Sequence, residues 1–393
     1  MNEGRDPSPV AKVSLGTIAG EWVRLGCIGF GGPPSHIALL RRLCVERRQW
    51  IDRSEFEDAI ATTSLLPGPA STQLAIYCAW RLRGTAGAVL GGLGFILPGL
   101  AAILALSAVF LAGHPPDWVL GSAAGAGAAV PAVALDAAYG LAPASWERIG
   151  SRRACKVRWA AYALAGGVVA ATVGPYLLLA LIACGVCEIV VRRQGKPTAF
   201  GSAPAIIPAT VLHLVTVGGL GALAWVAFKV GALSYGGGFV IVPLMQHDAV
   251  TTYHWMTDPQ FLNAVALGQV TPGPVVQTVA AVGYAAGGVG GGLIASLIAF
   301  GPSFAFILAG GRHFEQIRAN TSAESFLTGA GPAVIGAIAG SAVPLGLSLQ
   351  HLWQIPILAG ALLWLLAFRR GVVAAVLICG VIGATLALVG VPA

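Results

Sequence analysis

Glycine and proline interrupt four otherwise apolar segments of this 393-residue chain, at Gly29–Pro34, Leu66–Pro69, Ser234–Gly238 and Thr271–Pro274. Proline lacks the helical N–H group and clashes with the preceding turn, whereas glycine permits backbone conformations that other residues resist. Each interruption should therefore end one helix and begin another. The second helix then points free N–H groups and a partial positive charge at whatever lies before it. Four such helix starts predict a binding site for a small anion.

The side chains beside these breaks are mostly hydroxyls and carboxamides, which are uncharged donors suited to the oxygens of an oxyanion. The opposing interpretation is that they cap the broken helices and replace lost backbone hydrogen bonds. Polar residues on both sides of both Pro-Gly-Pro runs favour the binding site. The predicted anion-binding residues are Gly31, Gly32, Thr63, Ser64, Pro67, Gly68, Thr72, Gln73, Gly236, Gly237, Gln269, Thr271, Gly273 and Gln277.

The four breaks form two pairs, because the chain contains an internal repeat. Residues 26–75 align without a gap on residues 231–280, 205 positions later. The alignment places Trp50 on Trp255 and the first Pro-Gly-Pro run on the second. Two copies of one helical unit in an apolar chain predict a transporter built from structural repeats.

The composition predicts an all-α polytopic membrane protein. Hydrophobic residues make up 56% of the chain and charged residues only 10%, with a mean hydropathy of +0.79, whereas soluble proteins carry about 25% charged residues. About ten stretches are long enough to cross a bilayer, with broken or re-entrant half-helices at the glycine and proline motifs. The expected spans are 14–33, 86–112, 118–141, 158–173, 174–191, 209–235, 291–311, 324–345, 353–368 and 372–391.

The basic residues predict how the two copies are oriented. The net charge is +7, and most Lys and Arg residues lie in short loops, where they set orientation rather than bind nucleic acid. Loop 41–53 is basic, but its counterpart 246–258 has no Lys or Arg; conversely, loop 312–318 is basic and its counterpart 107–114 is not. Equivalent loops should therefore face opposite compartments. We predict two inverted-topology repeats, with the basic loops in the cytoplasm and the C-terminus outside it.

The same comparison predicts the domain boundaries. A polar N-terminal segment, residues 1–13, precedes the first repeat at 14–191. A cytoplasmic linker at 192–208 then leads to the second repeat at 209–393.

Charged residues near the breaks are further candidates. Arg24 and Lys229 occupy equivalent positions before the two glycine-rich breaks, where they could compensate the charge of an anion. Alternatively, Arg24 pairs with Glu21 at i,i+3, or either residue extends to the membrane interface. Glu21, Glu57 and Asp136 are candidates for a proton relay, although a place at a helix start, where acidic residues are favoured, explains Glu57 better.

At these residues the chain resembles the chromate ion transporter (CHR) family, in its long form with two copies. The resemblance covers about residues 15–391 and rests on several motifs taken together. They are Gly29-Phe30-Gly31-Gly32-Pro33 with His36, Glu46-Arg47-Arg48 with Trp50, Leu65–Pro69 with Thr72–Ala75, Tyr235–Gly238, and Gln269–Pro274. The resemblance implies a bacterial inner-membrane protein, with halves of opposite orientation, that expels chromate and gives resistance to it.

Three alternatives remain open at this point. The substrate could be another tetrahedral oxyanion such as sulfate, which backbone amides would bind by the same shape and charge. The protein could be a passive anion channel. It could also be an enzyme such as a chromate reductase, for which Cys184-x-x-Cys187 is the one supporting feature, although packing explains these cysteines better. We expect a transporter in a lipid bilayer, with no cofactor, metal or nucleic-acid partner; the coupling ion and a homodimer stay open.

Overall fold

The computed structural model describes residues 13–64, 66–111, 115–150, 152–172, 176–193, 219–234, 238–310 and 321–392, and it contains helices and turns without a strand in these ranges. The predicted all-α class is confirmed. Most of the linker predicted at 192–208 lies outside the described residues, as do the candidate site residues Gly236 and Gly237. Within the described ranges, four helices are long and apolar enough to cross a membrane, and shorter apolar helices accompany them. The four are Ala70–Phe110, Asp117–Arg148, Val275–Gly310 and Glu324–Leu347.

A helix lies over each of the ten expected apolar stretches. The helices of the first half are α1 (Leu15–Ile28), α2 (Gly32–Arg41), η1 (Arg42–Arg47), α3 (Arg53–Thr63), α4 (Ala70–Phe110), α5 (Asp117–Arg148), α6 (Arg153–Thr172) and α7 (Leu177–Arg193). Those of the second half are α8 (Leu220–Leu233), η4 (Phe239–Ile241), α9 (Val242–Gln246), η5 (His247–Thr252), α10 (Asp258–Val270), η6 (Val275–Gln277), α11 (Thr278–Gly310), α13 (Thr321–Leu347), α14 (Gln354–Leu362), η8 (Leu363–Ala367) and α15 (Val372–Leu388).

The backbone breaks where glycine and proline predict it. Gly31 and Gly32 take left-handed φ angles of 90° and 74° between α1 and α2, and Gly68 takes 116° between α3 and α4. A further break inside α4 was not predicted: Arg83 and Gly84 leave the helical conformation, so that residues 70–82 and 85–110 form two helices across a kink. The first half therefore begins with two helical hairpins, α1 with α2 and α3 with the start of α4.

Local backbone geometry recurs in the second half. The π-helix η1 has an equivalent in η5, 205 positions later. The left-handed residue Gln49 likewise has an equivalent in His254, also 205 positions later. The kink in α4 has an equivalent in α11, at Gly287 and Gly288. The conformations of individual residues thus follow the sequence repeat.

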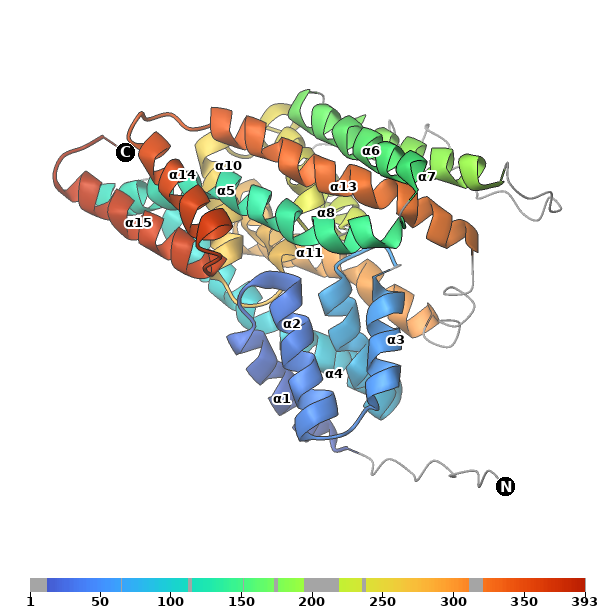
Figure 1. Cartoon of the computed structure of the whole chain (residues 1–393). Helices are drawn as coiled ribbons and strands as arrows, with labels where there is room; N and C mark the ends of the chain where they lie inside the picture. The colour runs from blue at the N-terminus through green and yellow to red at the C-terminus, as the bar shows by residue number, and fades with distance from the viewer. Residues whose placement is uncertain are drawn as a thin grey trace, which may run out of the picture.

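The two halves interlock through their longest helices. α5 of the first half packs against α14 and α15 at the end of the chain, while α13 of the second half packs against α6 and α7. α4 and α11 pack against each other. In Figure 1 the helices α1–α4 form the lower part of the molecule, and α5–α7 and α13–α15 lie above them.

Aromatic side chains anchor the first hairpin to α4. Trp22 of α1 is fully buried, and its indole Nε1–H donates to the Ala75 carbonyl at 2.8 Å. Its ring stacks on Trp50 with centroids 6.5 Å apart. These contacts hold the hairpin tip at Gly29–Gly31 in place against α4.

Glycine allows α6 and α13 to approach each other at backbone contact distance. A Cβ atom added at Gly336 would lie 1.7 Å from the Ala163 carbonyl oxygen, and one at Gly166 would lie 1.9 Å from the Ala333 carbonyl oxygen. Small residues at such contacts provide the van der Waals packing that associates helices in a bilayer.

Gly336→Ala should separate α6 from α13 and lower the stability of the protein by about 1–3 kcal/mol, the usual cost of overpacking. The measurement is the apparent melting temperature of the detergent-solubilised protein. Gly346→Ala is the matched control on the same helix, because nothing lies within 4 Å of a Cβ atom at that position. Equal melting temperatures for the two variants would contradict the close contact.

Candidate functional site

The helix breaks of the two halves meet in the interior. The N–H group of Gly273, in the second Pro-Gly-Pro run, donates to the Gly29 carbonyl at 2.7 Å. Gly99 of α4 packs so closely on the same run that a Cβ atom there would lie 1.9 Å from the Pro272 carbonyl oxygen. The second Pro-Gly-Pro run is thus wedged between the first glycine-rich break and α4.

The first Pro-Gly-Pro run meets the second half in a related way. A Cβ atom on Gly68 would lie 3.3 Å from the Ser303 hydroxyl of α11 and 3.4 Å from the Gly231 carbonyl of α8. Gly238 takes a φ of 96° after the second glycine-rich break, and a Cβ atom there would lie 3.0 Å from Val276. Three of the breaks therefore lie where the two halves are in contact, and Gly238 of the fourth packs beside the second Pro-Gly-Pro run.

Several candidate side chains already have partners that restrict their role. The hydroxyls of Thr63, Ser64 and Thr271 each donate to a carbonyl of the preceding turn, at 2.7–2.9 Å. A hydroxyl has one proton to donate. These three side chains therefore cap the helix ends that precede the Pro-Gly-Pro runs, and their protons are not available to an anion.

The two glutamines that follow the Pro-Gly-Pro runs replace lost backbone hydrogen bonds. Gln73 Nε2 donates to the Pro67 carbonyl, and Gln277 Nε2 donates to the Ile96 carbonyl of α4, both at 2.6 Å. Their side-chain oxygens are buried and without a partner among the described residues. Each glutamine thus fixes a break with one end and presents an unbonded polar atom with the other.

Unbonded polar atoms gather at the breaks. Eight buried side-chain N or O atoms lack a hydrogen-bond partner among the described residues, and six of them lie at the breaks or against them. The six are Thr72 Oγ1, Gln73 Oε1, Ser234 Oγ, Gln269 Nε2, Gln277 Oε1 and Ser303 Oγ. Buried polar groups are normally satisfied, because an unsatisfied one costs about 1–3 kcal/mol. A cluster of them marks a place where a polar ligand would bind. Ser234 and Ser303 were not among the residues predicted from the sequence.

His36 is a further residue that the sequence argument did not assign to the site. It is 1% exposed; its Nε2 lies 2.9 Å from the Gly29 carbonyl and its Nδ1 lies 3.2 Å from the Ser71 hydroxyl. A neutral imidazole fits both contacts, with Nε2–H donating and Nδ1 accepting. The ring also stands edge-on to Phe95 of α4. His36 therefore joins the first glycine-rich break to both parts of α4, through Ser71 before the kink and Phe95 after it.

The two basic candidates have acidic partners. Arg24 is 61% exposed and lies 4.0 Å from Glu21. Lys229 is more buried, at 15%, and its Nζ donates to Asp248 at 2.5 Å. Burial raises the pKa of Asp248, and the ammonium of Lys229 acts against this rise. Asp248 was also missed from the sequence, because nothing in its spacing from Lys229 marks the pair.

The three candidate proton-relay acids lie apart from one another. Glu21 accepts hydrogen bonds from Arg47 and Arg48, which ties α1 to the end of η1, the continuation of α2. Glu57 forms an ion pair with Arg41 at 2.8 Å, where both side chains are well exposed. Asp136 lies on α5 within electrostatic reach of Arg369. None of these three contacts involves one of the four breaks.

Comparison with known proteins identifies relatives over most of the chain. A family model described as chromate transporter matches residues 16–189 and 221–384, one match in each half. The chain is 32% identical to a chromate transport protein of Cupriavidus metallidurans over 88% of both chains. It is 30% identical to a chromate transport protein of Pseudomonas aeruginosa, over 85% of this chain and 81% of the relative. A probable chromate transport protein of Synechococcus elongatus is 28% identical over 86% of both chains. No solved structure matches the chain.

His36→Ala should destabilise the protein by about 2–4 kcal/mol, because it removes two buried contacts and leaves the partners of His36 unsatisfied. His36→Gln should recover part of this loss, since a carboxamide both donates and accepts. The measurement is the apparent melting temperature, with His254→Asn as the control at an exposed histidine. If His36→Ala melts like the control, His36 does not hold the breaks together.

Proposed function

The chain belongs to the chromate transporter family, and from this premise we propose that it exports chromate across a bacterial inner membrane and gives resistance to it. Family membership and the apolar helices describe a multi-pass membrane transporter rather than an enzyme. The proposed mechanism is alternating access around one anion site between the four helix breaks.

The observation that carries this proposal is the group of unbonded polar atoms at the breaks. The hydroxyls of Thr72, Ser234 and Ser303 and the amide of Gln269 are buried donors without partners among the described residues. The neighbouring helices α2, α4 and α11 begin at the breaks and direct their N-terminal partial charges there. Hydroxyls, an amide and helix N-termini together match the oxygens of a tetrahedral oxyanion.

Neither of the two basic candidates is available as a direct partner of the anion. Lys229 is engaged by Asp248, and Arg24 is mostly exposed beside Glu21. A dianion held by uncharged donors alone is easier to release than one held in a buried ion pair, which suits turnover. We therefore place charge compensation by Arg24 and Lys229 outside the binding step.

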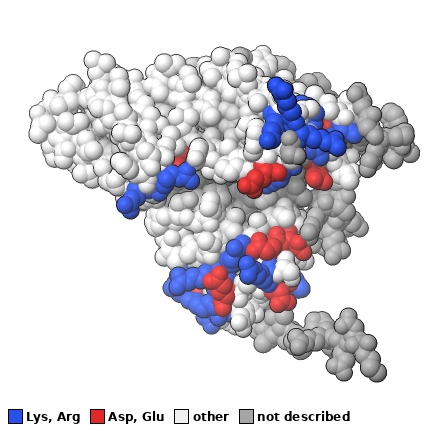
Figure 2. All heavy atoms as spheres, in the orientation of Figure 1, with Lys and Arg blue, Asp and Glu red and all other residues white. Residues whose placement is uncertain are grey.

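Two halves of opposite orientation would give such a site access to both compartments. The family model matches both halves, and the backbone breaks recur at the same spacing, which supports two copies of one unit. The unequal charge of equivalent loops supports their opposite orientation. In Figure 2, Lys and Arg gather on the lower part, at the right-hand end and in a smaller group at the left, on the lower edge of the upper part; the upper left carries none. We assign the basic parts to the cytoplasmic side, with the linker there and the C-terminus in the periplasm.

The membrane potential supplies the direction of transport. A cytoplasm-negative potential drives anions outward by about 2.3 kcal/mol per charge per 100 mV. A dianion gains twice this amount, so that export needs no second ion. Sulfate has the same shape and charge, and we propose it as a competitor at the same site.

Thr72→Val and Ser303→Ala should lower chromate uptake into everted vesicles about tenfold, the equivalent of one hydrogen bond to a charged group. Both changes remove a buried hydroxyl that has no partner among the described residues, so the melting temperature should stay the same or rise. Thr385→Val, at an exposed threonine of α15, is the matched control. Sulfate should compete with chromate in the unmodified protein.

Two outcomes would count against these assignments. Absence of chromate accumulation by the unmodified protein would remove the export proposal. Normal transport by Thr72→Val and Ser303→Ala would leave transport in place but move the anion site away from the breaks.

Single cysteines at positions 47 and 252 should react with a membrane-impermeant maleimide from opposite sides. Arg47 ends η1 and Thr252 ends η5, so the two positions are equivalent in the repeat. Labelling of Arg47→Cys from the cytoplasmic side and Thr252→Cys from the periplasmic side is expected. Labelling of both from one side would contradict inverted halves.

A further inference from the structure

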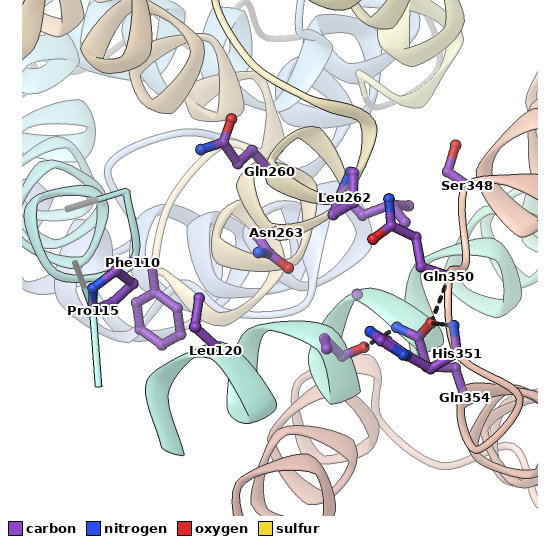
Figure 3. Close-up of a pocket in the computed structure, with 13 residues that line it drawn as sticks. Phe110, Pro115, Leu120, Gln260, Leu262, Asn263, Ser348, Gln350, His351 and Gln354 are labelled. Atoms are coloured by element: carbon purple, nitrogen blue, oxygen red, sulfur yellow. Dashed lines mark hydrogen bonds between the residues drawn. The ribbon is translucent and has the colours of Figure 1, made fainter. Parts of the chain in front are cut away.

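A cavity of about 330 Å3 lies apart from the helix breaks. It is bounded by the first residues of α10 and α14, by the start of α5, and by the ends of α4 and α13. In Figure 3, Asn263 lies between an apolar wall and a polar wall. Phe110, Pro115 and Leu120 form the apolar wall, and Ser348, Gln350, His351 and Gln354 form the polar one. The cavity thus has the form of a small-molecule site, with a few polar groups converging on an apolar surface.

The polar wall is held in a fixed arrangement by Gln354. Its Oε1 accepts from the N–H groups of Gln350 and His351 at 2.9 and 3.0 Å, and its Nε2 donates to the Ala124 carbonyl of α5 at 2.9 Å. Gln354 is only 5% exposed. The fold therefore fixes the shape of the cavity, because one buried side chain joins the loop before α14 to α5.

Uncharged donors remain available in this cavity. The Oε1 atom of Gln260 accepts from the Thr257 N–H at 2.9 Å, which leaves its Nε2 group as a donor. The carboxamides of Asn263 and Gln350 form no hydrogen bond with another described residue. No Lys, Arg, Asp or Glu is among the described lining residues. Asp258 lies close by, at the start of α10, where its carboxylate accepts from Gln246 at 2.7 Å.

The cavity and the breaks lie at opposite ends of one helix. Asn263 faces the cavity from α10, and Thr271 stands at the C-terminal end of this helix, at the second Pro-Gly-Pro run. Eight residues of helix separate them by about 12 Å. α4 makes the same connection, since Gly99 packs on that run and Phe110 lines the cavity. Both α10 and α4 thus run from the second Pro-Gly-Pro run to this cavity.

The equivalent positions of the first half are charged. Gln260 and Asn263 correspond, 205 positions earlier, to Glu55 and Asp58. Glu55 forms an ion pair with Arg81, and Asp58 also has a partner. The start of α6, which corresponds to the start of α14, carries Arg152, Arg153 and Lys156. This part of the first half, which we take as one mouth of the transporter, is thus rich in fixed charge, whereas the cavity at the other mouth has no Lys, Arg, Asp or Glu among its described lining residues.

We propose that this cavity is a weak exit site for the exported oxyanion, on the periplasmic face of the protein. This inference rests on the proposed function, because export makes this mouth the point of release. Neutral carboxamides recognise the oxygens of a tetrahedral dianion, and the absence of Lys and Arg from the described lining keeps the bound ion from being retained. The neighbouring carboxylate of Asp258 weakens binding further. The basic mouth collects the anion and the neutral mouth releases it.

The test uses Ser348→Cys and Gln350→Cys as reporters in the cavity and Thr252→Cys as a control on the same face. A membrane-impermeant maleimide is added to right-side-out vesicles, and labelling above that of the natural chain is measured with sulfate or with chloride at equal ionic strength. Sulfate should slow labelling of both reporters at least threefold and leave the control unchanged. Equal labelling rates in the two salts would overturn the proposal.

A second measurement tests release directly. Gln350→Lys places a cation in the cavity and should slow chromate export severalfold, because the added charge retains the dianion. Thr252→Lys adds the same charge on the same face outside the cavity and should not. If the unmodified protein exports chromate but neither the protection nor this slowing occurs, the exit site is wrong and the proposed function stands. If sulfate protects the reporters but chromate is not exported, the cavity binds oxyanions and the proposed function fails.

Discussion

The structure depends on one constraint: backbone groups freed by helix breaks inside an apolar chain must find partners away from lipid. The breaks of the two halves provide hydrogen-bond partners for one another. The N–H of Gly273 bonds the carbonyl of Gly29, far away in the sequence, and Gln73 and Gln277 bond carbonyls at or beside the Pro-Gly-Pro runs. This solution requires the breaks of both halves to meet, which in turn requires glycine where the backbone passes closest, as at Gly99.

The two halves stabilise their first hairpins in the same way with different residues. In the first half Glu21 of α1 accepts from Arg47 and Arg48 near the end of η1. In the second half the charges are exchanged, and Lys229 of α8 donates to Asp248 of η5. The charged groups near the breaks are thus engaged in holding hairpins closed. This division of roles leaves the meeting point of the breaks to uncharged donors.

Much of the local structure could be predicted from the sequence, because it depends on local rules. Glycine and proline fix where Gly31, Gly68 and Gly273 interrupt the helices, and apolar composition fixes the helix positions. The contacts between breaks could not be predicted, since they join residues of different halves. Periodicity also gave no sign that Thr63 caps its own helix while Thr72 stays unbonded. His36 was not recognised as a link between segments because the repeat places Ile241 at the equivalent position, so that the duplication itself gave no signal there.

The unbonded polar atoms at the breaks lower the stability of the protein. Each buried, unsatisfied hydroxyl or amide costs about 1–3 kcal/mol, and the six atoms at the breaks cannot be retained for stability. A valine at Thr72 would pack equally well and remove one of these costs. An anion would satisfy the four donors among them, the hydroxyls of Thr72, Ser234 and Ser303 and the amide of Gln269, and part of its binding free energy would come from that relief. A site in which none of the described residues offers an unpaired Lys or Arg would then bind a dianion only as strongly as this relief allows, so that the ion could leave it again.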